Sequence, residues 1–571
     1  MESRSEKLFG EGVRRTKGGE ARRYNLLAAR LIVDLIKNFL GPRGLEKMFI
    51  DILGEATITK HGATLLRKID VDHPAAKVLI DASNAVDNEV GDGTTSVAIL
   101  VGSLVEKAEQ LLDMGIASST VIAGYLKGLD FCLKILSSIS RSFPNYDKEI
   151  MINIARTILG TKSISLADSE GHLIANLIVN AIYAIANFRQ KSFEVDDIKI
   201  EEKIGNSSDI CLIRGVVIDK SIDNHSMPKM VEGAKILVIN EDLDNNRTKT
   251  EAQINITYPS DTSSYLQHEY AIVKSKTQRI IESGATVLIS QKGIGPLAQY
   301  FLAKEGIISI RRVKENDILW ISKATGASVT RDLDEISDND LGYAEKVYEK
   351  SIGDDRMVFV DGCKKPESVT LLLRANSKRA LDEYHRSVLS VIKVLRSFVT
   401  SPRVTGGGGA TEAIIANVIR RESTSITGRE QIVLHKFAEA LEEIPITISR
   451  NSGMNTVDTM AKLRSKYAFS SISKCNSGIG FYGIDAVQMS VQDVFDQSII
   501  DVSIVKEQVI KAAVEVSNLL IRVDDVLMAK PVLYTHTHND GTQHSHRGGD
   551  KKHDHYFDKL GKQQRPMHHY Y

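Results

Sequence analysis

The chain has few cysteines, and their scatter excludes the chemistry that clustered thiols support. Only four occur in 571 residues, at positions 132, 211, 363 and 475, with no C-x-x-C pair and no spacing suited to zinc. We therefore expect neither a disulfide framework nor a structural zinc site. A reducing compartment fits this pattern best, so the expected localisation is cytoplasmic.

An excess of charge of one sign is also lacking, as are long apolar runs. The 73 basic residues are balanced by 73 acidic ones, which leaves no net field to recruit nucleic acid or anionic lipid. The opening stretch has no apolar signal segment, and no later stretch is long enough and free enough of charge to cross a bilayer. We expect no nucleic-acid partner and no membrane association. A Walker lysine motif is missing too, which argues against a stand-alone kinase.

The chain is much longer than one hydrophobic core requires, and its patterns divide it into parts. A prior of about 150 residues per domain suggests roughly three or four units. Apolar residues between 22 and 40 recur at helical spacing until GPRG at 41–44 interrupts them, and residues 97–114 are strongly helical again. The first 145 or so residues are therefore expected to be mostly helix.

The middle of the chain has a different texture. Short apolar, β-branched runs alternate with helical segments from about 214 to 365, which predicts an α/β domain; the runs are 216–219, 236–240 and 286–290. Residues 242–275 are polar and suit either a projecting arm or an ordinary surface excursion. A helical pattern returns over residues 366–399.

Two glycine clusters are the strongest candidates for a binding site. GDGTTS at residues 91–96 combines flexible backbone, one carboxylate and three hydroxyls, which suits phosphate together with Mg²⁺ on Asp92. A solvent loop of the same composition is the ordinary alternative. A second cluster, GGGGA at residues 406–410, precedes another helical pattern. The pattern alone does not show that the two clusters meet in space.

Several motifs in order resemble the group II chaperonins, a family that includes the archaeal thermosomes and the eukaryotic cytosolic chaperonin. They are LGPRG (40–44), GDGTTS (91–96), RGVVIDK (214–220), MPK with VEGAKI (227–236), GGGA with a glutamate (407–412), FAEALEEIP (437–445) and RVDDV (522–526). The similarity extends nearly from end to end and stops near Pro531.

The resemblance implies a multidomain α and α/β fold, in which each subunit of a two-ring barrel has three domains. A mostly helical equatorial ATP-binding domain would comprise residues 1–145 and 401–531. A small intermediate domain would comprise 146–213 and 366–400, and an α/β apical substrate-binding domain 214–365, with a helical protrusion near 242–275. The implied cofactors are ATP and Mg²⁺, and the implied partners are other chaperonin subunits and non-native proteins.

The family's nucleotide contacts carry over onto matching positions of this sequence. Asp92 resembles the Mg²⁺ ligand, and Lys162 resembles the lysine that senses the terminal phosphate, although a solvated surface lysine remains an alternative because its surrounding motif is altered. The other implied contacts are Leu40, Gly41, Pro42, Gly62, Gly93, Thr94, Thr95, Ser96, Gly408, Gly409, Gly483, Asp485 and Asp501.

The sequence departs from the family at both positions where the family has a catalytic aspartate. The family tripeptide N-D-G reads Lys60-His61-Gly62, and an ungapped alignment from Arg386 places Ser390 at the second aspartate. A positioned general base typically contributes about 10² to 10⁴-fold to hydrolysis, and serine is no such base near neutral pH. We therefore expect weakened ATP hydrolysis. Two alternatives stay open: His61 compensates, or neighbouring groups restore ordinary turnover.

These departures suggest a role within a mixed ring. We expect a hetero-oligomeric double ring in which this subunit works beside hydrolysis-competent ones. The alternative is a mainly structural or regulatory ring component that sets assembly or ring composition.

The C-terminal residues 532–571 are polar and rich in histidine. Eight of the 15 histidines lie there, at positions 536, 538, 544, 546, 553, 555, 568 and 569. We expect this tail to be disordered. Imidazole suits Zn²⁺, Ni²⁺ and Cu²⁺, so both metal binding and a simply solvated tail are open.

Overall fold

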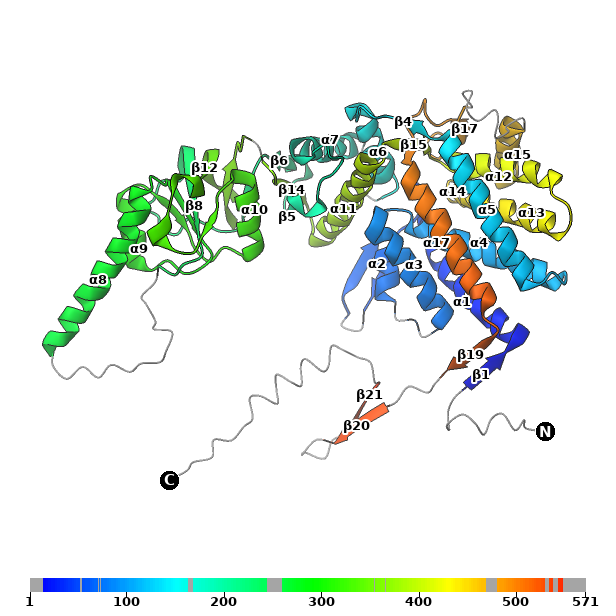
Figure 1. Cartoon of the computed structure of the whole chain (residues 1–571), viewed down its shortest axis with the longest axis horizontal. Coiled ribbons are helices and arrows are strands. Elements are labelled where there is room, and N and C mark those ends of the chain that lie inside the picture. The colour runs from blue at the N-terminus through cyan, green and yellow to red at the C-terminus, as the bar shows by residue number, and fades with distance from the viewer. Residues whose placement is uncertain are drawn as a thin grey trace.

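The computed structural model describes residues 14–51, 54–69, 71, 73–162, 168–243, 259–353, 355–364, 366–468, 480–528, 533–537 and 543–547. The molecule is elongated, with a helical body at one end, a sheet body at the other, and a small connecting region between them (Figure 1). Among the described helices, none combines the length and apolar character needed to span a membrane.

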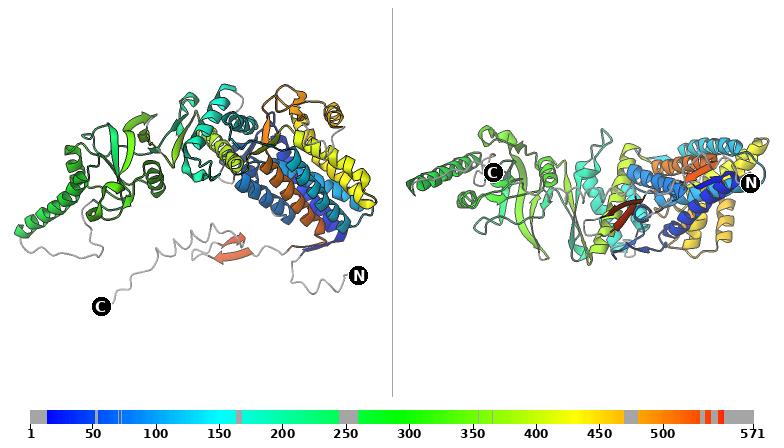
Figure 2. Two further views of the ribbon diagram at one scale, coloured as in Figure 1. Left: turned by 45° about the horizontal axis from the view of Figure 1, so that its top comes forward. Right: turned by 90° about the horizontal axis from the view of Figure 1, so that it is seen from below.

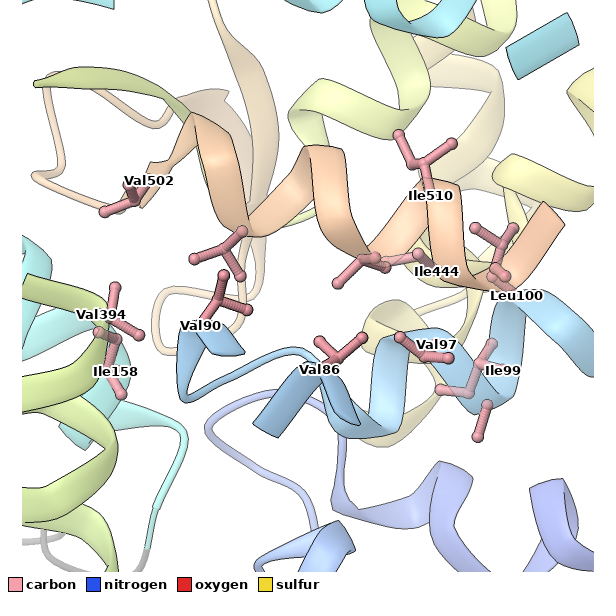
Figure 3. Packing of buried hydrophobic residues seen from close by; sticks show 14 of the residues in the cluster. Val86, Val90, Val97, Ile99, Leu100, Ile158, Val394, Ile444, Val502 and Ile510 are labelled. Carbon is pink, nitrogen blue, oxygen red and sulfur yellow. The ribbon is translucent and has the colours of Figure 1, made fainter. Parts of the chain in front are cut away.

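The helical body is a bundle of long helices from both ends of the chain (Figure 2). It contains α1 (Gly18–Ile36), α2 (Gly62–Lys68), α3 (Pro74–Val90), α4 (Thr94–Asp113), α5 (Ser118–Ile139), α12 (Ala410–Glu422), α13 (Arg429–Leu441), α14 (Glu443–Asn451), α15 (Thr456–Tyr467) and α17 (Ser503–Arg522). Most of these helices bury one apolar stripe against their neighbours, whereas α4 over residues 97–101 and α12 over residues 410–416 are buried on every side. Figure 3 shows Val86 and Val97 among the side chains between α3, α4 and α17, while Ile510 points to another side of α17.

Short strand pairs join distant parts of the chain within this body. Strands β1 (Arg14–Lys17) and β19 (Asp525–Met528) pair antiparallel, so the first and last segments of the body lie together. The other pairings are β2 (Lys47–Ile50) with β3 (Ala56–Thr59), β16 (Tyr482–Asp485) with β17 (Ser490–Asp493), and β15 (Arg403–Gly406) between β18 (Ile500–Val502) and β4 (Arg141–Ser142).

The connecting region consists of three helices around a small sheet. The helices are α6 (Lys148–Gly160), α7 (Asp168–Ile185) and α11 (Lys378–Thr400), and the sheet has the order β5 (Ile198–Ile204), β14 (Val369–Ala375), β6 (Cys211–Ile213). The 366–399 segment was expected to be helical throughout, and this is wrong for its first part, which forms β14. All seven residues of β14 are buried, and a fully buried apolar run lacks the alternation that distinguishes a strand from a helix.

The sheet body has a seven-stranded mixed sheet covered by helices. Its order is β10 (Ile308–Ile310), β9 (Val287–Ser290), β8 (Met230–Ile239), β12 (Gly342–Ile352), β13 (Asp355–Asp361), β7 (Val216–Ile218), with β11 (Val329–Thr330) also pairing with β8. The helices are α8 (Pro259–Glu282), α9 (Pro296–Lys304) and α10 (Glu315–Thr325). A hydrophobic core separate from that of the helical body lies between these layers.

These observations confirm the predicted mixture of α and α/β architecture, while the predicted domain boundaries stay predictions. Of the polar excursion predicted at 242–275, residues 244–258 lie outside the described part of the chain, and the rest includes most of α8. Most of the tail predicted to be disordered also lies outside it. Ten tail residues within it form two strands, β20 (Leu533–Thr537) and β21 (Gln543–Arg547), which pair antiparallel, and the disorder of the tail stays a prediction.

Candidate functional site

The first glycine cluster forms a tight loop between two helices. Helix α3 ends at Gly91 with φ of 83°, and α4 begins after Gly93 with φ of 94°, so both glycines have left-handed backbone. A Cβ atom on Gly93 would lie 2.5 Å from Cγ2 of Val509, and one on Gly91 would lie 2.3 Å from Cβ of Lys393. Conformation and packing therefore both require glycine here, and they hold Asp92 between the two helix ends.

The second glycine cluster repeats this arrangement at another helix. Gly408 and Gly409 have φ of 58° and 77°, and α12 begins directly after Gly409. A Cβ on Gly408 would lie 2.5 Å from the carbonyl oxygen of Ile484. The N-terminal backbone N–H groups of a helix carry partial positive charge, so α4 and α12 both present an anion-attracting end.

Both helix starts open onto one pocket. The cavity has a volume of about 420 Å³, and its wall includes residues that are hundreds of positions apart in the sequence. The residues singled out from the sequence that line it are Leu40, Gly41, Pro42, Asp92, Gly93, Ser96, Gly408, Gly409, Asp485 and Asp501. The structure thus brings the two glycine clusters together, while the role of each residue as a nucleotide contact stays a prediction.

The remaining predicted contacts lie behind this wall. A Cβ atom on Gly62 would lie 3.0 Å from Oγ1 of both Thr94 and Thr95, so the start of α2 packs directly on the start of α4. Gly483 faces the second glycine loop, where its Cβ would lie 2.9 Å from the carbonyl oxygen of Gly407. These residues support the shape of the loops rather than lining the cavity.

Lys162 lies beside the proposed magnesium ligand. It follows α6, and its Nζ lies 3.4 Å from Oδ1 of Asp92. Its side chain is only 8% exposed. The alternative of a solvated surface lysine therefore does not hold.

The two positions at which the resemblance predicts replaced aspartates, His61 and Ser390, also meet. Nε2 of His61, the residue before α2, lies 3.3 Å from Oγ of Ser390 on α11. The same nitrogen lies 3.3 Å from Oδ1 of Asp87 on α3, and Nδ1 lies 3.2 Å from Oγ1 of Thr64. Only 5% of the surface of His61 is exposed. Both ring nitrogens are therefore engaged.

Asp87 is a functional candidate that the sequence reasoning missed. It accepts a hydrogen bond of 2.6 Å from Arg67, in addition to its contact with His61. Burial pushes the pKa of Asp87 upward, but His61, Lys393 and Arg67 outweigh it and leave the pKa below its usual value. Burial, assisted by Lys162, lowers the pKa of His61. A neutral imidazole beside an ionised carboxylate satisfies both shifts.

In that pair, the hydrogen-bond network assigns the imidazole proton. The carboxylate of Asp87 only accepts, so Nε2 of His61 carries the hydrogen. Nδ1 is then left as an acceptor, and the hydroxyl of Thr64 donates to it.

Two acidic residues that line the cavity, Asp485 and Asp501, already have partners. Asp485 accepts from the backbone N–H groups of Val487 and Gln488 at 2.8 and 3.0 Å, which fixes the turn between β16 and β17. Asp501 pairs with Lys506 at 2.9 Å. Burial would lower the pKa of Lys506, but Asp501 and the buried Glu412 raise it overall. Lys506 also lines the pocket and was missed from the sequence, where it is one lysine among many.

A second buried lysine, Lys60, contacts the loop that contains the pocket residue Pro42. Lys60 donates a hydrogen bond of 3.1 Å from Nζ to the carbonyl oxygen of Pro42. Burial, with a contribution from Lys162, lowers the pKa of Lys60 to about 8. Lys60 and Lys162 are thus two buried lysines that contact residues of the cavity wall, Pro42 and Asp92.

A cavity enclosed by two left-handed glycine loops at helix starts, with a carboxylate, a buried lysine and an apolar wall, is of the class that suits a phosphorylated ligand with a cation. The family follows from comparison with known proteins. The chain belongs to the TCP-1/cpn60 chaperonin family, whose family model matches residues 32–531.

Its curated relatives include archaeal thermosome subunits. It is 40% identical to the thermosome subunit alpha of Archaeoglobus fulgidus, over 92% of this chain and 94% of the relative. It is 39% identical to the thermosome subunit alpha of Sulfolobus acidocaldarius, over 91% and 94%. It is 37% identical to the thermosome subunit of Methanocaldococcus jannaschii, over 95% and 97%. The resemblance predicted from the sequence motifs is thereby confirmed.

Proposed function

We propose that this chain is a subunit of a double-ring chaperonin that encloses non-native proteins and assists their folding under the control of ATP. In this proposal the helical body is the equatorial ATP-binding domain, the connecting region is the intermediate domain, and the sheet body is the apical domain that contacts substrates. Family membership over residues 32–531 supports the assignment. The expected compartment is the cytoplasm.

The residues of the pocket fit ATP with Mg²⁺. The N-terminal ends of α4 and α12 and the lysines Lys60 and Lys162 would hold the phosphates, and Asp92 would be the oxygen ligand of the cation. When bound, Mg²⁺ would supply neutralisation of charge on the phosphate oxygens. Pocket residues such as Ile448 and Ile484 offer an apolar surface for the remainder of the nucleotide.

The observation that carries the proposal of weakened hydrolysis is the engagement of His61. Its Nε2 faces Asp87 and Ser390, and its Nδ1 faces the hydroxyl of Thr64. A general base needs a free lone pair within hydrogen-bond reach of the attacking water. Because Nε2 of His61 donates a hydrogen bond and Nδ1 already accepts one, His61 holds helices together instead of accepting a proton. The hydroxyl of Ser390 is a poor base.

We further propose that the ring is hetero-oligomeric. A subunit that binds ATP and cleaves it slowly would remain in one conformational state, closed or open, for longer than its neighbours. The neighbouring subunits would then need to carry out most of the ATP hydrolysis of the ring. Other subunits of the same family are thus the expected partners, together with non-native polypeptides.

The test is reconstitution. Rings assembled with and without this subunit are compared for native mass and for recovery of a chemically denatured client in the presence of ATP. The proposal predicts that the subunit enters a double ring of defined mass and that its rings protect and release the client. A chain that stays outside any ring assembly would contradict the proposal.

A second candidate function is a mainly structural or regulatory ring component. The pocket is retained, while His61 and Ser390 differ from the family pattern. This combination favours a regulatory ring component over a subunit that no longer responds to nucleotide at all. It predicts that the subunit changes ring mass or subunit order, while client recovery per ring is unchanged.

A further inference from the structure

Helix α6 belongs to the connecting region, yet it forms part of the pocket wall. Ile154, Thr157 and Ile158 of this helix line the cavity. The backbone N–H of Lys162, which follows α6, donates to the carbonyl oxygen of Leu159 at 2.9 Å, so its main chain is fixed to the last turn of the helix. The position of Lys162 therefore depends on where α6 lies.

The hydroxyl of Thr157 joins α6 to the strand that carries Asp501. Its Oγ1 accepts a hydrogen bond of 3.1 Å from the backbone N–H of Ile500, the first residue of β18. The same oxygen lies 2.9 Å from the carbonyl oxygen of Asn153 on α6 and 3.3 Å from that of Ser498. A hydroxyl has one proton and two lone pairs, so it donates to these carbonyls while it accepts from Ile500. One side chain thus links a helix of the connecting region to the helical body.

The strand at the other end of this link is also held by other contacts. β18 pairs antiparallel with β15 through three residue pairs. Lys506 on α17 pairs with Asp501 of the same strand at 2.9 Å. Loss of the Thr157 hydroxyl would therefore loosen α6 more than β18.

Thr157 and Lys162 provide the hydrogen bonds that join α6 and the residues just after it to the helical body, within the part of the chain that the structure describes. The contact of Lys162 is with Asp92, at 3.4 Å. In the proposed function, Lys162 contacts a phosphate and Asp92 contacts Mg²⁺, so their mutual contact is exchanged for contacts with the ligand. The link through Thr157 is then the one that remains between the protein's own groups.

We propose that Thr157 is a positioning residue for recognition of the terminal phosphate of ATP. Its hydroxyl holds α6 against β18 and thereby keeps Lys162 in place beside the cavity. This inference rests on the proposed function, because it takes the pocket to bind ATP. Since Thr157 acts through Lys162, its effect should appear in the preference for ATP over ADP and should disappear when Lys162 is removed.

The test compares variants of the full-length chain by calorimetric titration with a non-hydrolysable ATP analogue and with ADP, both in Mg²⁺ buffer. Thr157→Val removes the hydroxyl and keeps a similar shape, whereas Thr157→Ser keeps the hydroxyl. Thr157→Ala removes the same hydroxyl with a residue of higher helix propensity, so a folding defect caused by valine does not decide the result. Lys162→Met, alone and combined with Thr157→Val, completes a double-mutant cycle.

Thr459→Val on α15 is the matched control. The hydroxyl of Thr459 donates at 2.7 Å to the carbonyl oxygen of Asn455, one turn earlier in the same helix, as the hydroxyl of Thr157 does to Asn153. The control therefore removes the bond within the helix without touching a link between α6 and β18.

The proposal predicts that Thr157→Val weakens binding of the ATP analogue roughly 3- to 10-fold and ADP binding by less than about 2-fold, the size expected for one lost hydrogen bond. Thr157→Ala should give the same pattern, while Thr157→Ser and Thr459→Val should bind both nucleotides like the wild type. In the Lys162→Met background, Thr157→Val should cause no further loss of the preference for the ATP analogue.

An unchanged preference in both Thr157→Val and Thr157→Ala would overturn the inference. Equal weakening of the ATP analogue and ADP would overturn it as well, because that result indicates a general structural role. So would a full loss of preference on top of Lys162→Met, because the effect would then not act through the lysine. A wild-type protein that bound neither nucleotide would instead contradict the proposed function of the pocket.

Discussion

His61 and Ser390 are 329 positions apart in the sequence, yet Nε2 of the first lies 3.3 Å from Oγ of the second. The contact joins the start of α2 to the middle of α11, so it links the helical body to the helix that leads into it from the connecting region. Two side chains that the family resemblance assigns to one catalytic pair therefore touch. What they form is a hydrogen-bonded junction anchored by Asp87.

The glycine at position 93 is predicted to be irreplaceable for two separate reasons. Gly93→Ala would place a β-carbon in left-handed backbone, which costs roughly 1 to 2 kcal/mol, and 2.5 Å from Val509, where overpacking costs roughly 1 to 3 kcal/mol more. We expect a loss of at least about 2 kcal/mol in the free energy of unfolding together with weaker nucleotide binding. Denaturant unfolding and titration with a fluorescent ATP analogue measure the two effects.

Gly115→Ala is the matched control for this variant. Gly115 also has positive φ, 79°, but a Cβ there would meet nothing within 4 Å. It should lose only the conformational part, roughly 1 to 2 kcal/mol, and retain wild-type nucleotide affinity. Equal losses in the two variants would show that packing against Val509 contributes nothing.

Lys162 is predicted to distinguish ATP from ADP. Hydrogen bonds to charged groups contribute about 1.5 to 3 kcal/mol, which corresponds to roughly 10-fold or more in affinity. Lys162→Met should therefore weaken ATP binding about 10-fold or more and ADP binding much less, as measured by calorimetric titration in Mg²⁺ buffer. Lys127→Met, which removes a half-buried lysine paired with Glu430, is the control and should change neither. Equal weakening of ATP and ADP would contradict a role at the terminal phosphate.

The lowered pKa of His61 predicts that the free energy of unfolding decreases as the pH falls. Because the folded-state pKa lies below the ordinary value of about 6.5, the unfolded chain binds more protons between the two values. The contribution to stability is then fully present above pH 6.5 and is lost as the pH falls towards the folded pKa, by at most about 1.4 kcal/mol per pH unit. His61→Asn should flatten this dependence between pH 7.5 and pH 5 in unfolding experiments. An equally steep dependence in the variant would assign it to other groups.

The glycine loops could be predicted from sequence, because short motifs carry their own conformational requirement. Gly93 and Gly408 need left-handed backbone at helix starts, and that need is visible as a local pattern. Asp87 could not be found in the same way. It reads as one polar residue of an amphipathic helix, and only the approach of His61 and Arg67 makes it part of the site.

Strand β14 could not be predicted from the sequence either. The residues of β14 are all buried, so the run has no alternation, and its neighbour β5 is more than 160 positions away. The deciding information is the pairing between these strands, which a single-sequence pattern does not contain.

The most direct test of the central claim is a comparison of ATP binding and single-turnover ATP hydrolysis in the wild type and in the double variant His61→Asp with Ser390→Asp. We predict that both proteins bind ATP with Mg²⁺ with similar affinity and that the double variant cleaves it about 10²-fold faster or more, as expected when a positioned carboxylate base is restored. An unchanged rate in the double variant, with binding intact, would contradict the claim that these two positions limit hydrolysis.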